Sequence, residues 1–430
     1  MARSKDRFED LPDDVLELLL SFLPTRDAVR TSVLAPRWRT LWKSVPALRL
    51  DGSQFESAQV FSNFVNKLLE HRDRTSHLHE CEIFFISKYY YGRFDREDRN
   101  GKARREVESW VQYAVLCRVP VLRVLNRGDN YMELSSSSVI SKHLTRLELY
   151  QLVFYEGPLD LFSCEALEVL EMEDCTINLG DILPKSLRHL KARGSRFFSW
   201  DWKWDTRRNC ISAPGLLTFE LADCVGWTPL LESLPSLVTS FIRINMNCED
   251  VCMYNEYRGD CGDGSCEGCY GEDDRCLLLE GLASATNLEL ISEYSVIFRK
   301  DLRWNPMFSK LKTVLFNDWC LTANFAGLLY FLQHTPILEK LALQLPSHEY
   351  LDIISSGSYN PAEYFLVSKH LKGSVSSSRS RSDGLLFLVI QALVSLNQCW
   401  QHRLSTFCLP GSCACPVPSI CRMNSRRDAV

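Results

Sequence analysis

The sequence predicts an α/β fold: a small three-helix module, then a solenoid of parallel strands on a concave face, then an irregular C-terminal tail. Three observations lead to this prediction. Prolines divide the first fifty residues into short helical segments, and leucines recur at regular intervals between residues 120 and 345. No such pattern continues after Pro346. Leucines that recur with a period of roughly 20 to 29 residues are typical of stacked repeats.

Composition excludes several classes of protein. The chain has 430 residues, of which 46% are hydrophobic and 24% are charged, and its net charge is −5. A mildly acidic chain offers no electrostatic attraction for nucleic acid or an anionic membrane surface. The longest apolar run, residues 385–396, is shorter than the roughly 20 residues that span a bilayer. We therefore expect no nucleic acid and no membrane partner, and a location in the cytoplasm, the nucleus or both.

The three-helix module is predicted at residues 6–50. Pro12 can begin the first helix, Pro24 ends it, and Pro36 separates the second from the third. The first helix carries two apolar stripes: Val15, Leu19 and Phe22, and Leu16, Leu20 and Leu23. A segment of about 40 residues cannot bury two stripes alone, so one is expected to meet a partner. Alternatively, the rest of the chain covers it.

Three motifs in this module carry a family resemblance. They are DLPDDVL at 10–16, LSFLPTRDAVRTSVL at 20–34 and RWRTLW at 37–42. Their order and spacing resemble the F-box of plant F-box and leucine-rich repeat proteins. The resemblance implies that the module binds a Skp-family adaptor, and through it the cullin of an SCF-type ubiquitin ligase. The residues that the resemblance implies for adaptor binding, either facing the adaptor or supporting those that do, are Leu11, Pro12, Val15, Leu16, Leu19, Leu20, Leu23 and Val33.

The sequence does not settle which stripe of the first helix faces the adaptor. Trp38, Leu41 and Trp42 are expected to build the core of the module. The next segment, residues 51–119, is predicted to be an entry region containing a helix, a strand and a second helix.

The repeat body is predicted at residues 120–345. Nine leucine-rich segments begin at Leu122, Leu144, Leu167, Leu187, Leu216, Leu237, Leu288, Leu311 and Leu338. Small side chains are expected to turn inward after the strands, as at Cys175, Cys224 and Asn245. Alternate strand residues face solvent, and the candidates for binding a protein target are Glu148, Tyr150, Glu171, Glu173, Lys191, Arg193, Glu220 and Asn317. The alternative is that these side chains only solvate the sheet.

A cysteine-rich insertion is predicted at residues 247–276, within the longest step between repeats. Its acidic, glycine-rich composition favours a solvated loop with incidental thiols, and we expect no cofactor. The alternative is a zinc site formed by Cys261, Cys266, Cys269 and Cys276, since structural zinc usually takes four ligands. Only Cys266 and Cys269 have the common two-residue separation.

The family resemblance extends to about residue 345, and the tail at 346–430 departs from it and is expected to be disordered. The motifs of common enzyme classes are missing from the sequence. Consistent with this absence, the family resemblance implies a non-catalytic substrate-recognition subunit, in which the repeats bind an unknown protein target for ubiquitination. The alternative is an adaptor-bound scaffold or decoy that delivers no target.

Overall fold

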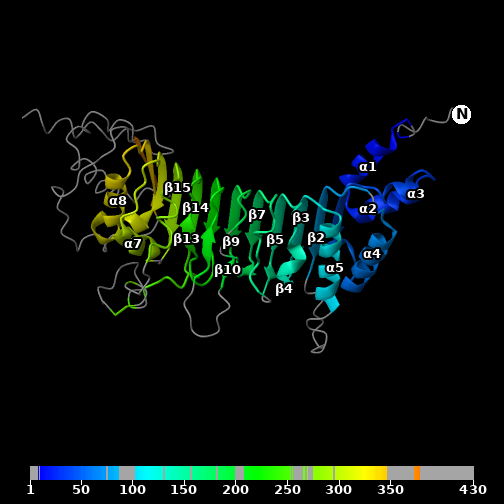
Figure 1. Ribbon diagram of the computed structural model, residues 1–430, viewed down its shortest axis with the longest axis horizontal. Coiled ribbons are helices and arrows are strands. Elements are labelled where there is room, and N and C mark those ends of the chain that lie inside the picture. Colours follow the sequence, from blue (N-terminus) through cyan, green and yellow to red (C-terminus); the bar gives the residue numbers. More distant parts are fainter. Residues whose placement is uncertain are drawn as a thin grey trace, which may run out of the picture. The chain divides into compact units, whose positions relative to one another are not determined.

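The computed structural model (Figure 1) places the chain in two compact units. The first contains residues 1–220 and 224–233, and the second contains residues 221–223 and 234–430. The structure describes residues 8, 10–73, 76–86, 102–128, 131–154, 157–180, 183–198, 208–252, 254, 265–266, 269, 275–293, 296–345 and 372–377.

The first unit begins with short helices, as the prolines predicted. They are α1 (Asp13–Ser21), α2 (Thr25–Arg30), the 3-10 turn η1 (Thr31–Val33) and α3 (Trp38–Leu41). Pro12 and Pro24 occupy the positions directly before α1 and α2. Asp13 and Asp14 place negative charge in the first turn of α1, where the helix dipole favours it.

A parallel sheet follows the helices. Its strands are β1 (Ala47–Asp51), β2 (Glu80–Phe85), β3 (Val121–Asn126), β5 (Arg146–Tyr150), β7 (Val169–Glu173), β9 (His189–Arg193) and β12 (Thr218–Ala222), and they lie side by side in this order. Every pairing from β1 to β9 is parallel. The predicted α/β fold with stacked parallel strands is confirmed, and β1 and β2 extend it ahead of the first leucine-rich segment.

Helices and short strands complete the first unit. The entry region forms α4 (Ala58–His71) and α5 (Lys102–Leu116), on either side of β2 in the sequence. Phe61 of α4 meets Trp110 of α5 edge to face, with ring centroids 5.3 Å apart. Beyond the main sheet, short strands form two further sheets. One contains β4 (Met132–Glu133), β6 (Leu152–Val153), β8 (Thr176–Ile177) and β10 (Arg196–Phe197). The other pairs β11 (Cys210–Ser212) with β13 (Leu230–Ser233).

The chain leaves successive strands through the same left-handed turn. Gln151, Asp174 and Gly194 directly follow β5, β7 and β9, with φ of 54°, 52° and 56°. Asp223 follows β12 with φ of 56°. The next residue is buried each time, as at Leu152, Cys175, Ser195 and Cys224. The repeat therefore explains the two buried cysteines without thiol chemistry.

The second unit contains the remaining predicted repeats. Its parallel strands are β14 (Thr239–Ile244), β15 (Asn287–Ser292), β16 (Thr313–Asn317), β17 (Lys340–Leu345) and β18 (Lys372–Ser377). They are joined by α7 (Ile297–Asp301) with η5 (Leu302–Trp304), and by η6 (Asp318–Leu321) with α8 (Thr322–His334). Phe331 packs against Phe308 and Phe316, with both centroid distances 4.8 Å. Trp319 donates its indole N–H to the carbonyl of Leu290 at 2.8 Å.

One part of the predicted tail differs from expectation. We assigned no repeat register after Pro346, but Lys372–Ser377 forms β18 and pairs with β17 over six residues. Backbone groups at the edge of a sheet accept a further strand whatever its side chains, so a serine-rich segment can join without leucines. The rest of the tail lies outside the described residues. No helix in the described part of the chain is both long and apolar enough to cross a membrane.

Gly194 gives a test of the repeated turn. A Cβ atom there would lie 2.1 Å from a carboxylate oxygen of Asp174, and φ is in the left-handed region. We expect Gly194→Ala to lower the free energy of unfolding by roughly 1–3 kcal/mol, measured by urea denaturation.

Gly180→Ala is the matched control for this substitution. A Cβ atom there would only touch neighbours at ordinary contact distances of 3.4 Å or more. Equal denaturation midpoints for the two variants would contradict the assignment of this turn.

Candidate functional site

One face of α1 is buried within the three-helix module. Leu16 is 0% exposed and Leu20 is 2% exposed. They form one core cluster with Ala28, Leu41 and Val45. The prediction that Leu16 and Leu20 belong to the adaptor-binding set is therefore corrected. They face inward because positions four apart on a helix share a face, and this face meets α2 and α3.

The other face of α1 is exposed and apolar. We define the outer apolar surface as the exposed apolar side chains of α1, η1 and the residues directly after them: Val15, Leu18, Leu19, Phe22, Leu23, Val33 and Leu34. Phe22 is 69% exposed and Val33 is 85% exposed. Of the twenty exposed large apolar side chains in the described residues, eight lie between Phe8 and Leu34. Such concentration on a small module indicates a protein-binding surface.

The predicted adaptor-binding residues differ in their exposure, and the exposed surface includes residues that were not predicted. Val15, Leu19, Leu23 and Val33 lie in the outer apolar surface, and Pro12 is exposed beside it. Leu11 instead packs partly buried against the core. The prediction omitted Leu18, Phe22 and Leu34, although Phe22 continues the stripe begun by Val15 and Leu19. Trp38 and Leu41 join the core as expected, whereas Trp42 is half-buried outside that cluster.

Polar contacts hold the module in place. Arg37 forms an ion pair with Asp13 at 2.6 Å and donates to the carbonyl of Leu11 at 2.5 Å. Thr25 accepts a hydrogen bond from the backbone N–H of Arg49 at 2.8 Å, which ties α2 to β1. These contacts fix the orientation in which α1 presents its exposed face.

The solvent face of the first unit's sheet carries a row of charges. Parallel register places Arg49, Glu82, Arg123, Glu148, Glu171 and Lys191 side by side on successive strands from β1 to β9. A second row on the same face ends with Tyr150, Glu173 and Arg193. Residues two apart along a strand share a face, so the predicted target-binding side chains of this unit lie together.

Ion pairs join these charges across the strands. Arg123 meets Glu148 at 3.0 Å, Arg146 meets Glu171 at 2.6 Å, and Lys191 meets Glu171 at 3.7 Å. Burial alone would raise the pKa of Glu148, but hydrogen bonds from Arg146 and Arg123 outweigh it and hold the pKa below its usual value. Arg123 also pairs with Glu80, and Arg193 with Glu220. Glu80, Arg123 and Arg146 were absent from the predicted set, although they occupy alternate strand positions.

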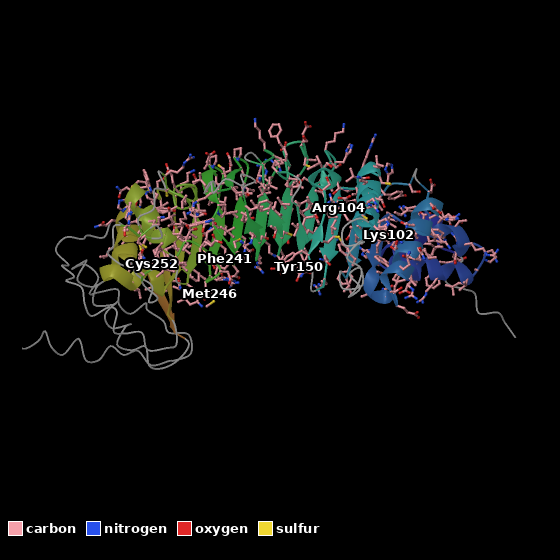
Figure 2. The ribbon with its side chains drawn as sticks, turned by 90° about the horizontal axis from the view of Figure 1, so that it is seen from below. Lys102, Arg104, Tyr150, Phe241, Met246 and Cys252 are labelled. Atoms are coloured by element: carbon pink, nitrogen blue, oxygen red, sulfur yellow. The ribbon has the colours of Figure 1, made fainter. Side chains whose placement is uncertain are left out.

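Two predicted target-binding residues have distinct settings. Tyr150 lies on β5 (Figure 2), with the guanidinium of Arg127 5.7 Å from its ring centroid. Asn317 is not a surface residue, and its prediction was wrong. It is 9% exposed, accepts from the backbone N–H of Ser292 and donates to the carbonyl of Ser292, both at 2.9 Å. It ends β16, where the chain turns inward and the amide satisfies backbone groups of β15.

The predicted zinc ligands are separated in the structure. Cys266 and Cys269 lie together, joined by Cys252, whereas Cys261 lies outside the described residues. Cys276 is buried elsewhere and accepts a hydrogen bond from the backbone N–H of Glu280 at 3.2 Å. Near it, Asp301 accepts from the N–H groups of Leu277, Leu278 and Leu279. Burial raises the pKa of Asp301 to about 6, although these N–H groups favour the charged form.

Comparison with known proteins identifies the module. A model of the F-box domain matches residues 8–50, the segment that contains both the core and the outer apolar surface. An F-box/FBD/LRR-repeat protein of Arabidopsis thaliana is 26% identical over 377 residues, covering 81% of this chain and 80% of the relative. The chain contains an F-box domain and is similar along most of its length to an Arabidopsis F-box/FBD/LRR-repeat protein. Its three-helix module is the F-box, and its parallel strands are the repeats.

Other Arabidopsis relatives match this chain over shorter lengths. A second Arabidopsis F-box/FBD/LRR-repeat protein is 27% identical over 57% of this chain and 59% of its own length. Arabidopsis F-box/LRR-repeat protein 13 is 30% identical over 39% of this chain and 35% of its own length. The chain thus spans a little over half of the first of these and about a third of the second. F-box domains in general bind Skp-type adaptors, and proteins of this family are generally non-catalytic.

The two faces of α1 predict effects of very different size on the stability of the F-box. We expect Leu16→Ala to destabilise it by about 2–5 kcal/mol, because the substitution leaves a cavity in a closed core. Leu19→Ala is the matched control, and its cost should stay within about 0.5 kcal/mol because the side chain is exposed.

Amide hydrogen exchange in α1 measures both effects. Faster exchange in the Leu16 variant alone is the expected result. Equal protection in the two variants would show that the assigned faces of α1 are wrong.

Proposed function

We propose that this chain is the substrate-recognition subunit of an SCF-type ubiquitin ligase. Its F-box binds a Skp-family adaptor and, through it, a cullin, and its repeats bind a protein target for ubiquitination. The observation that supports this proposal most directly is the outer apolar surface of the F-box, exposed on a module whose own core is complete without it.

The adaptor supplies the apolar environment that these side chains lack. Fully burying a leucine or phenylalanine side chain stabilises a complex by about 1.5–3 kcal/mol relative to leaving it in water. Val15, Leu18, Leu19 and Phe22 follow one another at the i, i+3, i+4 and i+7 positions of one helix face, the pattern of a helix that binds in an apolar groove. The ion pair of Arg37 with Asp13 fixes the start of that helix before the adaptor arrives.

The charged face of the sheet is the proposed target surface. Its side chains neutralise one another in the free protein, so a target must replace or extend these pairs. Complementary charge of this kind contributes more to specificity and association rate than to affinity. Ubiquitin transfer belongs to other subunits in this proposal, and the chain contributes no bond-making step. The cytoplasm, the nucleus or both remain the expected location.

Adaptor binding is tested with a double substitution in the outer apolar surface. We expect Leu19→Ala combined with Phe22→Ala to raise the Kd for a plant Skp-type adaptor several hundred-fold, since loss of two central anchors costs at least ~2 kcal/mol each. The measurement is isothermal titration calorimetry with the purified full chain. Val60→Ala is the matched control, because Val60 is also an exposed apolar side chain but lies on α4. An unchanged Kd in the folded double variant would refute the assignment of this surface.

Target binding is tested on the outward rows of two adjacent strands. Glu171, Glu173, Lys191 and Arg193 are replaced together by alanine, which removes charges from β7 and β9. We expect capture of ubiquitinated proteins to fall at least about tenfold, which needs a loss of only ~1.4 kcal/mol. The readout is quantitative mass spectrometry after affinity purification from cells with the proteasome inhibited.

The control for this experiment removes a different exposed ion pair. Lys312 and Glu339 meet at 3.3 Å in the second unit, and alanine at both positions should leave target capture unchanged. Adaptor affinity should be unchanged in every variant. Adaptor binding without any captured target from the unsubstituted chain would instead favour the scaffold or decoy alternative.

A further inference from the structure

Three cysteine thiols converge in the segment between β14 and β15. The Sγ atoms of Cys252, Cys266 and Cys269 all lie within 4.8 Å of one another, and those of Cys252 and Cys266 are 4.0 Å apart. A disulfide would bring two sulfurs to about 2.05 Å. Thiolates around a tetrahedral zinc ion, at Zn–S distances of about 2.3 Å, stand about 3.8 Å from one another. The observed separation therefore fits ligands around a metal ion better than a disulfide.

The thiols are held by the folded part of the second unit. Cys266 and Cys269 are 1% and 2% exposed and pack against Val296, with Cys252 partly buried beside them. Val296 precedes α7 and donates its N–H to the carbonyl of Asp250 at 3.0 Å. Arg303 of η5 donates to the carbonyl of Cys269 at 2.9 Å. This hydrogen bond anchors the backbone of Cys269 to η5.

Other cysteines of the same insertion have different partners. Cys248 directs its Sγ to a carboxylate oxygen of Asp250 at 3.6 Å, and Cys276 lies near the carbonyl of Asp301 at 3.9 Å. Both are buried, as structural cysteines commonly are. In the described part of the insertion, only the three convergent thiols form a group with metal-ligand geometry. Cysteine-rich composition by itself does not account for that convergence.

We propose that Cys252, Cys266 and Cys269 bind one zinc ion. Zinc displaces the three thiol protons, and the thiolates take three of its four tetrahedral positions. Because Cys252 lies 14 residues before Cys266 and 17 before Cys269, the ion cross-links the start of the insertion to its Cys-x-x-Cys part beside α7. This site is independent of the proposed adaptor and target surfaces, and it stabilises the long connection that separates two repeat strands.

The test uses the full chain, kept reduced with a phosphine so that no added thiol competes for metal. After dialysis against chelator, zinc chloride is added, and the bound zinc is counted by inductively coupled plasma mass spectrometry. We expect one zinc ion per chain and a rise in Tm that chelator reverses. Loss of a residue that only hydrogen-bonds to a metal ligand typically weakens metal binding roughly 10- to 100-fold. Because C252S, C266S and C269S each remove a ligand itself, each should raise the Kd for zinc by more than that.

Two comparisons make the result decisive. C248S removes a buried thiol of the same insertion outside the cluster, and it should leave both stoichiometry and Kd unchanged. Titration of the unsubstituted chain with cobalt(II) gives thiolate-to-metal charge-transfer absorption whose intensity counts the bound thiolates, and this readout does not depend on the folding of any variant. Substoichiometric zinc, fewer than three thiolates on cobalt, or equal loss of zinc in C248S would overturn the proposal.

Discussion

Parallel register between successive short strands is the constraint on which the repeat body depends. In the first unit, Leu122, Leu147, Leu170 and Leu190 stand side by side on β3, β5, β7 and β9. All four are almost fully buried. A slip of one residue in any pair would turn a leucine to solvent and a charged residue to the core. Burial of the leucine row therefore fixes which residues form the row next to it, and with them the charged face.

The charged face follows from that register and not from local sequence. Arg123 lies 25 residues before Glu148, and Arg146 lies 25 residues before Glu171, yet neighbouring strands bring each pair into contact. An exposed ion pair contributes only about 0–1 kcal/mol, so the network adds little to stability. Its effect is to set the charge pattern that a partner meets. The repeats thus present a surface whose side chains are already held in place by one another.

The first helix of the F-box is apolar on two opposite faces, one buried and one exposed. Leu16 and Leu20 close a core that needs only five buried side chains, while the opposite face remains apolar and exposed. A core of this size tolerates the loss of few side chains. The hydrogen bond from the Arg49 backbone to Thr25 and the ion pair of Arg37 with Asp13 add polar contacts that hold the helices in place. The second unit has a different additional constraint. Its long connection between β14 and β15 carries three convergent thiols.

The sequence by itself determined the order of elements. Proline positions marked the F-box helices, and each of the nine leucine-rich segments corresponds to one strand, because helix ends and buried strand positions depend on local residue types. Long-range contacts were decided only by the tertiary structure. Leu16 and Leu19 are both leucines of one helix, and packing against α2 and α3 alone makes the first a core residue and leaves the second exposed.

Long-range contacts also decide which of the predicted target-binding and metal-binding residues are correct. Asn317 occupies the strand position of an outward side chain, but it turns inward because backbone groups of Ser292 need partners. Cys276 has the sequence context of a metal ligand, yet the fold places it near Asp301 and brings Cys252 to Cys266 in its stead. Sequence specified which residues were available. Which of them meet depends on strand register and chain reversal, which act between residues far apart in the sequence.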